Sequence, residues 1–84
     1  MKAPRATYEV NGAAIRETRM SRGIPTADLA RSAGISRSYL CRLEIGARTR
    51  MRPATFARLL AGFESHGVPL EAQQLLAAGA TDSE

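Results

Sequence analysis

Residues 26–45 have the sequence TADLARSAGISRSYLCRLEI, and this stretch decides the expected fold. Apolar positions recur at helical spacing on both sides of Gly34, which predicts two short amphipathic helices joined by a tight turn. Gly34 can adopt positive φ at the end of the first helix, and Ser36 is a good N-cap for the second. We therefore expect one helix over about residues 25–33 and another over about residues 37–45.

The second of these helices has two chemically different faces. At ~100° per residue, its apolar side chains gather within an arc of ~100° that holds Tyr39, Leu40 and Leu43. The opposite arc is polar and basic, and it holds Arg37, Ser38, Cys41 and Arg42. This arrangement predicts a helix that lies on the core with one face and presents the other to the major groove of DNA.

Capping residues and proline positions predict three more helices, over about residues 12–22, 53–66 and 69–78. Asn11 is a good N-cap for the first of them. Pro25 and Pro53 suit the first position of a helix, because that position needs no backbone N–H. The chain is therefore expected to be all-α, with five helices.

The two ends of the chain lack helical periodicity. Residues 1–10 are expected to form a flexible arm, with an extended conformation at residues 8–10. Residues 11–78 are expected to form one domain, in which residues 47–52 are a loop. Residues 79–84 are expected to be an acidic tail.

The composition limits the functions that the chain can have. A length of 84 residues and a hydrophobic fraction of 44% indicate one small domain with a core. One cysteine and one histidine exclude an internal disulfide and a zinc cluster, and they offer no catalytic pairing, so we do not expect an enzyme. No apolar run reaches the length of a membrane span, and no cofactor or small-molecule ligand is evident. These features predict a cytoplasmic protein.

The net charge of +4 is distributed unevenly. Residues 29–63 hold seven arginines against Glu44 alone, a balance of +6, whereas residues 64–84 hold four acidic side chains and no lysine or arginine. Arginine supplies eleven of the twelve basic residues, and its guanidinium suits bidentate contacts with phosphate and guanine. The middle of the chain is expected to face nucleic acid, with an ordinary solvated basic face as the alternative.

The stretch at residues 26–45 resembles the helix-turn-helix of the XRE family, the Cro and phage-repressor type. The resemblance covers roughly residues 11–63 and is carried by Leu29-Ala30, Gly34-Ile35-Ser36, Leu40, Leu43-Glu44 and Gly46. It implies a five-helix, lambda-repressor-like DNA-binding domain with residues 36–45 as the recognition helix. It also implies a buried structural ion pair between Arg19 and Glu44.

The chain departs from the usual family pattern at four positions. Thr26 stands where the family commonly has a phosphate-contacting Gln, and Pro25 replaces the usual capping Ser. Ile45 replaces an Asn that often precedes the glycine, and Thr18 stands where Leu is usual. At Pro25, Thr26 and Ile45 the chain lacks residues that the family commonly uses for backbone contacts. The helix-turn-helix pattern itself is kept.

Residue types and helix register assign expected roles at a DNA interface. Arg42 is the first candidate for base contacts, because a guanidinium can span O6 and N7 of guanine. The other base-contacting candidates are Arg37, Ser38 and Cys41, with phosphate binding near the helix N-terminus as the alternative role of Arg37 and Ser38. Expected phosphate contacts are Thr26, Ser36, Arg48, Arg50 and Arg52. Tyr39 either packs on the core or donates its hydroxyl to a phosphate, and two arm residues are minor-groove candidates, Lys2 and Arg5.

These features predict a sequence-specific DNA-binding transcriptional regulator, namely a bacterial or phage repressor of the Cro-like or immunity type. Helix 37–45 is expected to enter the major groove of an operator. Family members often dimerise through the last helix, which predicts a homodimer interface at Leu70, Leu75 and Leu76. The alternative is that these leucines close the core of a monomer. A second functional hypothesis is an antitoxin that binds a protein partner and its own promoter.

Overall fold

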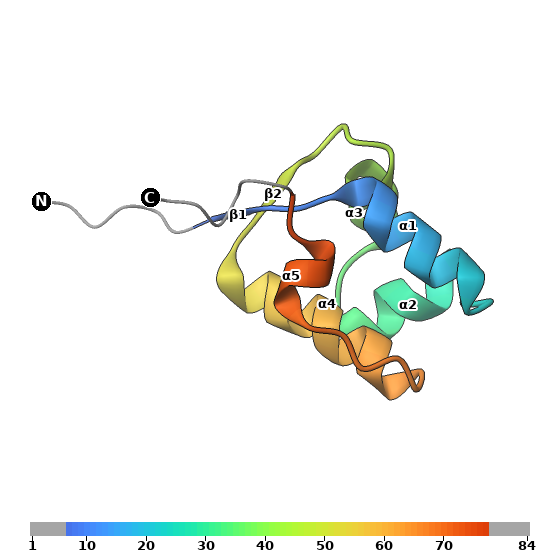
Figure 1. The fold of residues 1–84 in the computed structure, drawn as a ribbon. Helices are drawn as coiled ribbons and strands as arrows, with labels where there is room; N and C mark the ends of the chain where they lie inside the picture. Colours follow the sequence, from blue (N-terminus) through green and yellow to red (C-terminus); the bar gives the residue numbers. More distant parts are fainter. Residues whose placement is uncertain (1–6, 78–84) are drawn as a thin grey trace, which may run out of the picture.

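The computed structural model describes residues 7–77 of the chain. This part contains five helices and a two-stranded antiparallel sheet (Figure 1). The helices are α1 (Gly12–Ser21), α2 (Thr26–Ala33), α3 (Arg37–Glu44), α4 (Pro53–Ser65) and α5 (Ala72–Leu75). The strands are β1 (Tyr8–Glu9) and β2 (Arg50–Met51). The small five-helix fold predicted from the sequence is confirmed, with a minimal sheet added to it.

Local capping signals determine where α1, α2 and α3 begin and end. The Asn11 side chain accepts a hydrogen bond of 3.1 Å, and the Ser36 hydroxyl one of 3.0 Å, each from the backbone N–H three residues further on. Gly34 has a φ of 71°, the left-handed conformation that ends α2 without Cβ strain. Pro25 was expected at the first position of α2. In the structure it is the extended N-cap residue, and α2 begins one residue later, at Thr26. The turn between α2 and α3 is therefore specified by its own residues.

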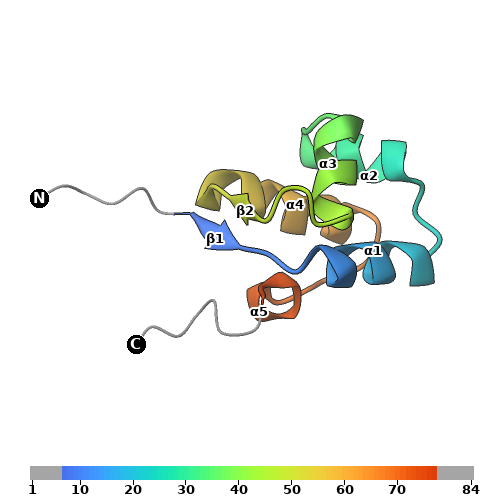
Figure 2. The same ribbon diagram turned by 90° about the horizontal axis from the view of Figure 1, so that it is seen from above.

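The core lies where the long helices cross. α2 packs against both α3 and α4, while α1 packs against α3 and α5. Seen from above, α2 and α3 lie on one side of the molecule and α5 on the other (Figure 2). The largest completely buried side chains in the helices are Ile15, Leu29, Leu40, Leu43, Leu59, Phe63 and Leu75. These contacts hold the inner face of α3 and leave its other face free.

The backbones of α1 and α3 come very close to each other at Gly12. A Cβ on Gly12 would overlap the carbonyl oxygen of Leu43, so only glycine fits at this position. The backbone of the first turn of α1 therefore lies directly against the last turn of α3.

Residues 7–10 differ from the predicted flexible arm. β1 pairs with β2, inside the segment that was expected to be the loop 47–52. Val10 is buried, and its backbone N–H donates to the carbonyl of Thr49 over 2.8 Å. The extended conformation expected at residues 8–10 is present, but strand pairing and burial hold it on the domain.

The last helix is shorter than predicted. α5 begins at Ala72 rather than near residue 69. It ends at Leu75 rather than near residue 78, because the chain after it is extended and pairs with the N-terminal segment. Leu76 forms an antiparallel bridge with Val10, and the N–H of Ala77 donates to the carbonyl of Glu9 over 2.9 Å. The two ends of the described chain therefore lie side by side.

Some predicted features lie outside the described residues, namely Lys2, Arg5 and the acidic tail 79–84. Among the helices described between residues 7 and 77, none is long and apolar enough to cross a membrane. Within the same range, no three His, Cys, Asp or Glu side chains form a group that could hold a metal ion.

Candidate DNA interface

α3 turns its polar side outward. Leu40 and Leu43 are completely buried on its inner side. The four side chains predicted to contact bases are all exposed on the opposite side, and we call this surface the α3 face: Arg37, Ser38, Cys41 and Arg42. The α3 face carries two guanidinium groups and no carboxylate, so it offers hydrogen-bond donors and positive charge to a groove.

Arg48 is held beside α3 by its backbone and by an aromatic ring. Its backbone N–H donates to the carbonyl of Arg42 over 3.0 Å, and its guanidinium carbon lies 5.3 Å from the centre of the Tyr39 ring. This distance is typical of a cation–π contact. Tyr39 is partly buried and packs against the core, so its ring is a platform for the arginine. Of the two roles expected for Tyr39, packing on the core is the one that the structure shows, and a bond from its hydroxyl to a phosphate is the untested alternative.

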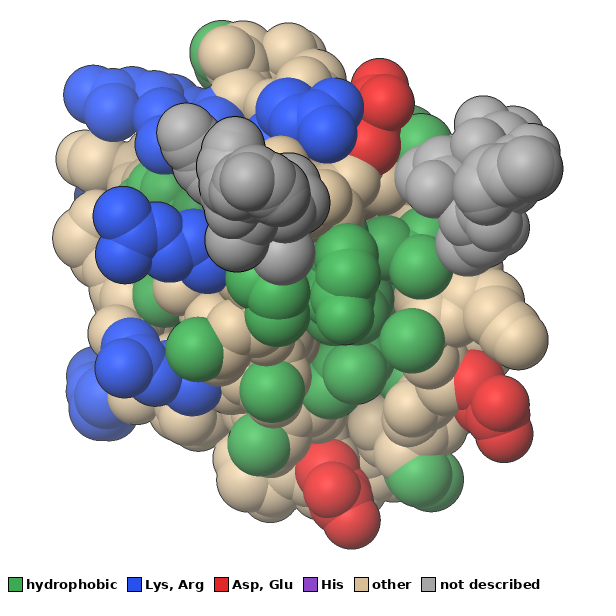
Figure 3. Space-filling view, turned by 90° about the vertical axis from the view of Figure 1, so that its left-hand side faces the viewer, with side chains coloured by type: hydrophobic (Ala, Val, Ile, Leu, Met, Phe, Trp, Pro, Cys, Tyr) green, Lys and Arg blue, Asp and Glu red, His purple; other side chains and the backbone are tan. Residues whose placement is uncertain are grey.

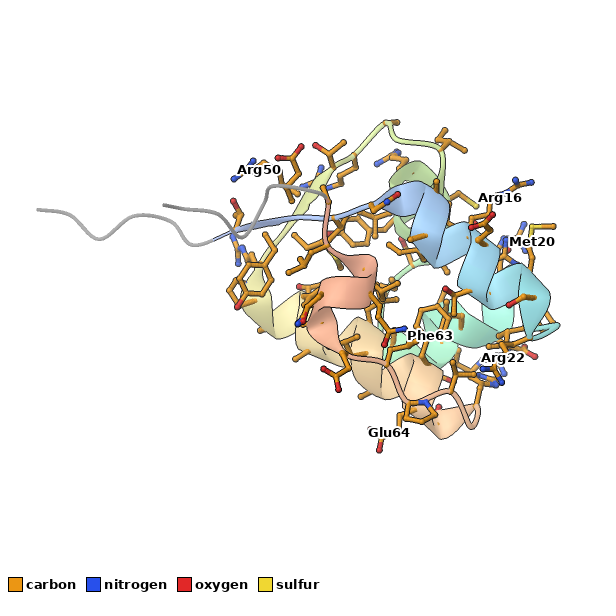
Figure 4. The ribbon with its side chains drawn as sticks, viewed as in Figure 1. Arg16, Met20, Arg22, Arg50, Phe63 and Glu64 are labelled. Atoms are coloured by element: carbon orange, nitrogen blue, oxygen red, sulfur yellow. The ribbon has the colours of Figure 1, made fainter. Side chains whose placement is uncertain are left out.

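Arg50 and Arg52 lie on either side of the buried Met51, and both are exposed. Alternate residues of an extended segment point to the same side, so these two arginines share an outward direction. Arg50 is tied to β1, because its Nε donates to the Thr7 hydroxyl over 3.0 Å and its Nη1 lies 3.6 Å from the Glu9 carboxylate (Figure 4). Arg52 is the residue that precedes α4.

The arginines after α3 converge on one hollow, which we call the basic groove. It has a volume of about 540 Å³, and its polar lining includes Ser36, Tyr39, Arg48, Arg50, Arg52 and Arg58. Arginine side chains gather along one edge of the molecule in the space-filling view, beside a hydrophobic area (Figure 3). A groove with four guanidinium groups and several hydroxyls is suited to phosphate oxygens.

The sequence-based prediction missed Arg58, because α4 was considered only for its apolar stripe. The exposed Arg58 side chain lines the basic groove, and its Cδ would lie 3.8 Å from a Cβ built on Gly34. Its stem therefore passes close to the turn between α2 and α3. A signal for this position exists, since Thr55 and Arg58 are spaced three apart on the polar side of α4, and Arg52 lies three residues before Thr55.

The two hydroxyl residues predicted to bind phosphate have different surroundings. Ser36 lines the basic groove, and its oxygen accepts the capping hydrogen bond, so it has only its proton to donate to a phosphate. Thr26 is partly buried in the first turn of α2 and is not among the residues that line the groove. The structure brings Ser36 together with the arginines and leaves Thr26 apart from them.

A buried ion pair fixes α3 to the rest of the domain. Arg19 of α1 donates from Nε and Nη2 to the Glu44 carboxylate over 2.7 and 2.9 Å, and from Nη1 to the carbonyl of Ile24 over 3.0 Å. The Arg19 and Glu44 side chains are 12% and 5% exposed. The hydrogen bond to Glu44 outweighs the effect of burial and raises the pKa of Arg19, which therefore stays charged. The geometry is that of the pair implied by the family resemblance.

The three leucines predicted to form a dimer interface are not equivalent. Leu75 is completely buried in the core, so it cannot contact a second copy, while Leu70 and Leu76 are partly exposed. Leu76 also lines an apolar groove of about 440 Å³ together with Tyr8, Phe56 and Leu60. The prediction is therefore wrong for Leu75, because this side chain is completely buried in the core of its own domain.

Comparison with known proteins identifies the family to which the chain belongs. A family model described as "Helix-turn-helix domain" matches residues 12–73. The chain belongs to the helix-turn-helix domain family. A similar solved structure is the restriction-modification controller protein C.AhdI from Aeromonas hydrophila, with a TM-score of 0.60 and 25% identity over 75% of this chain and 86% of that one. No curated protein is significantly similar to the chain in sequence.

In this helix-turn-helix domain, α2 and α3 are the consecutive helices joined by the tight turn at Gly34, the arrangement typical of the motif. The XRE-type resemblance inferred from residues 26–45 is confirmed. The protein is therefore a DNA-binding transcription regulator.

Proposed function

We propose that the protein is a sequence-specific repressor that places the α3 face in the major groove of an operator. The observation that carries this proposal is the exposure of Arg37, Ser38, Cys41 and Arg42 on one side of a helix whose other side is buried. Arg42 makes a bidentate contact with guanine, and the neighbouring basic groove holds the adjacent phosphates. The bound protein blocks polymerase without a catalytic step, as a Cro-like or immunity repressor of a bacterium or phage.

Selection of binding sites from a random DNA duplex library tests this function. The expected result is a short enriched motif that contains at least one guanine on which binding depends. A promoter that overlaps this motif should then give less transcript when the protein is added. Retention of all duplexes alike, with affinity set only by salt, would contradict sequence-specific binding.

We propose that two copies bind together through the apolar groove, with Leu76 and Leu60 in the interface in place of the buried Leu75. Support comes from the partly exposed apolar side chains that line this groove. A two-fold dimer buries the same patch of each copy and presents two α3 faces to half-sites about 10 bp apart, or a multiple of that spacing.

Sedimentation equilibrium tests the dimer. The wild-type chain should associate with rising concentration, and Leu60→Lys should remain monomeric. Met20→Lys is the matched control, because Met20 is exposed on α1 and lines neither groove (Figure 4). A wild-type chain that stays monomeric at high concentration overturns the dimer.

A second candidate function is control of restriction–modification genes. It is favoured by the similarity to the solved controller protein, at 25% identity and a TM-score of 0.60. Mapping of the DNA bound by the protein in its own cell separates the two candidates. Sites upstream of restriction or methyltransferase genes indicate a controller, and sites in phage control regions indicate a Cro-like or immunity repressor.

A further inference from the structure

One apolar side chain extends the α3 face without serving the core. Ile45, the residue after α3, is 75% exposed. Its backbone N–H donates to the carbonyl of Cys41 over 3.0 Å, and its φ and ψ are −92° and 2°. This bond is the helical i to i−4 bond, so Ile45 continues the spiral of α3 by one residue.

The register of the helix places Ile45 among the predicted base contacts. At ~100° per residue, Ile45 lies ~80° around the axis from Arg37, whereas Cys41 lies at ~40° and Arg42 at ~140°. Ile45 therefore falls in the middle of the α3 face, one turn beyond Cys41. Cys41 is also exposed and is only weakly polar, so the two side chains form an apolar strip between the arginines.

We propose that Ile45, with Cys41 beside it, contacts the C5-methyl group of a pyrimidine in the major groove. This inference rests on the proposed function and adds a specificity-determining residue to it. The C5-methyl is the apolar group that thymine presents in the major groove, and 5-methylcytosine carries the same group. A methyl contact requires an exposed apolar side chain beside the base-contacting arginines, and Ile45 provides one at the end of the α3 face.

The charge around Ile45 favours DNA over an apolar protein partner. Arg37 and Arg42 lie on either side of the strip, and Arg48 is anchored to the Arg42 carbonyl. An apolar surface laid over Ile45 would have to desolvate these cations without pairing them, whereas DNA pairs them with phosphates or guanine.

Exposure alone does not assign such a role, because single apolar residues are common on protein surfaces. Met20 is 54% exposed, but it lies on α1, outside the α3 face (Figure 4). It therefore serves as the matched control for a loss of apolar surface.

The experiment compares wild type, Ile45→Ala and Met20→Ala on the duplex enriched from the random library. In one arm each thymine is replaced in turn by deoxyuridine, which removes only the methyl group. In the other arm each cytosine is replaced in turn by 5-methylcytosine, which adds only that group. Loss of one buried methyl contact is expected to weaken binding about fourfold.

The proposal expects one position at which the methyl group changes the affinity of wild type and Met20→Ala but not that of Ile45→Ala. An effect in the deoxyuridine arm identifies thymine as the source of the methyl group, and an effect in the other arm identifies 5-methylcytosine. Equal methyl effects in wild type and Ile45→Ala, or none in either, overturn the inference while leaving sequence-specific binding intact. Absence of any enriched duplex for wild type overturns both this inference and the proposed function.

Discussion

Tyr39 shows how a single residue positions a charge that lies outside the helices. Its ring packs on the core at one side and lies 5.3 Å from the Arg48 guanidinium at the other. In the interface that we propose, the flexible Arg48 side chain would lose less conformational entropy on binding a phosphate, because its orientation is already restricted. The ring, rather than the hydroxyl, is what this arrangement uses.

We therefore expect Tyr39→Phe to bind the selected duplex as tightly as wild type, since the ring is kept. Tyr39→Ala removes the platform and should weaken binding by about two- to fivefold, the value of an exposed cation–π contact. Fluorescence anisotropy titration measures both, and urea unfolding checks that the variants are folded. An equal loss in Tyr39→Phe and Tyr39→Ala would show instead that the hydroxyl binds DNA.

At the scale of elements, α3 is fixed at its C-terminal end by two independent contacts with α1. Gly12 allows the backbones to touch at Leu43, and Arg19 holds Glu44 through two hydrogen bonds. The arginine also bonds to the loop before α2, so one side chain joins three segments. The outward direction of the α3 face depends on this junction.

Breaking the ion pair should destabilise the domain. Glu44→Leu leaves the Arg19 charge buried without its partner, and the free energy of unfolding should fall by about 3–5 kcal/mol. The double variant Arg19→Met with Glu44→Leu should recover much of this loss, because no unpaired charge remains. Urea denaturation measures each value.

Arg31→Met is the matched control, since Arg31 is 78% exposed and its nearest Asp28 oxygen is 4.0 Å away, so little change is expected. A Glu44→Leu variant as stable as wild type would contradict the structural role of the pair.

The raised pKa of Arg19 determines the direction in which the stability from this ion pair changes with pH. Its contribution is fully present below the unfolded-state pKa of arginine and is lost only as pH rises through the folded value.

For the molecule as a whole, the first three helices could be predicted because their signals are local. Asn11, Gly34 and Ser36 act on backbone groups within three residues of themselves, so the sequence alone locates the helix ends. The same holds for the two faces of α3, which follow from its register. Recognition of the family added the Arg19 and Glu44 pair, whose members are 25 residues apart.

The features that sequence reasoning missed depend on contacts between distant segments. β1 and β2 are each two residues long, which is too short to show the alternating pattern that predicts a strand. Their pairing also explains why residues 7–10 are not a free arm. α5 ends early because Leu76 meets Val10, a contact across 66 residues of chain. Arg58 joins the basic groove only because α4 crosses beside the turn at Gly34.

The charge distribution predicts how the whole domain responds to salt. If about four phosphates are neutralised per domain, log affinity should fall with log salt at a slope of about −3.6. Arg58→Ala should reduce the magnitude of the slope by about one unit and weaken all sequences alike, whereas Arg31→Ala, outside the basic groove, should leave it unchanged. Titrations at several salt concentrations measure the slope, and an unchanged slope for Arg58→Ala would remove this residue from the interface.

The central claim is that the α3 face selects DNA sequence while the basic groove supplies affinity. The most direct measurement compares Arg42→Ala and Arg52→Ala on every single-base variant of the selected duplex. Arg42→Ala should lose discrimination at one guanine, a loss worth about 1–3 kcal/mol, while Arg52→Ala should keep the full preference at lower affinity. A folded Arg42→Ala protein with the base preferences of wild type would contradict the account.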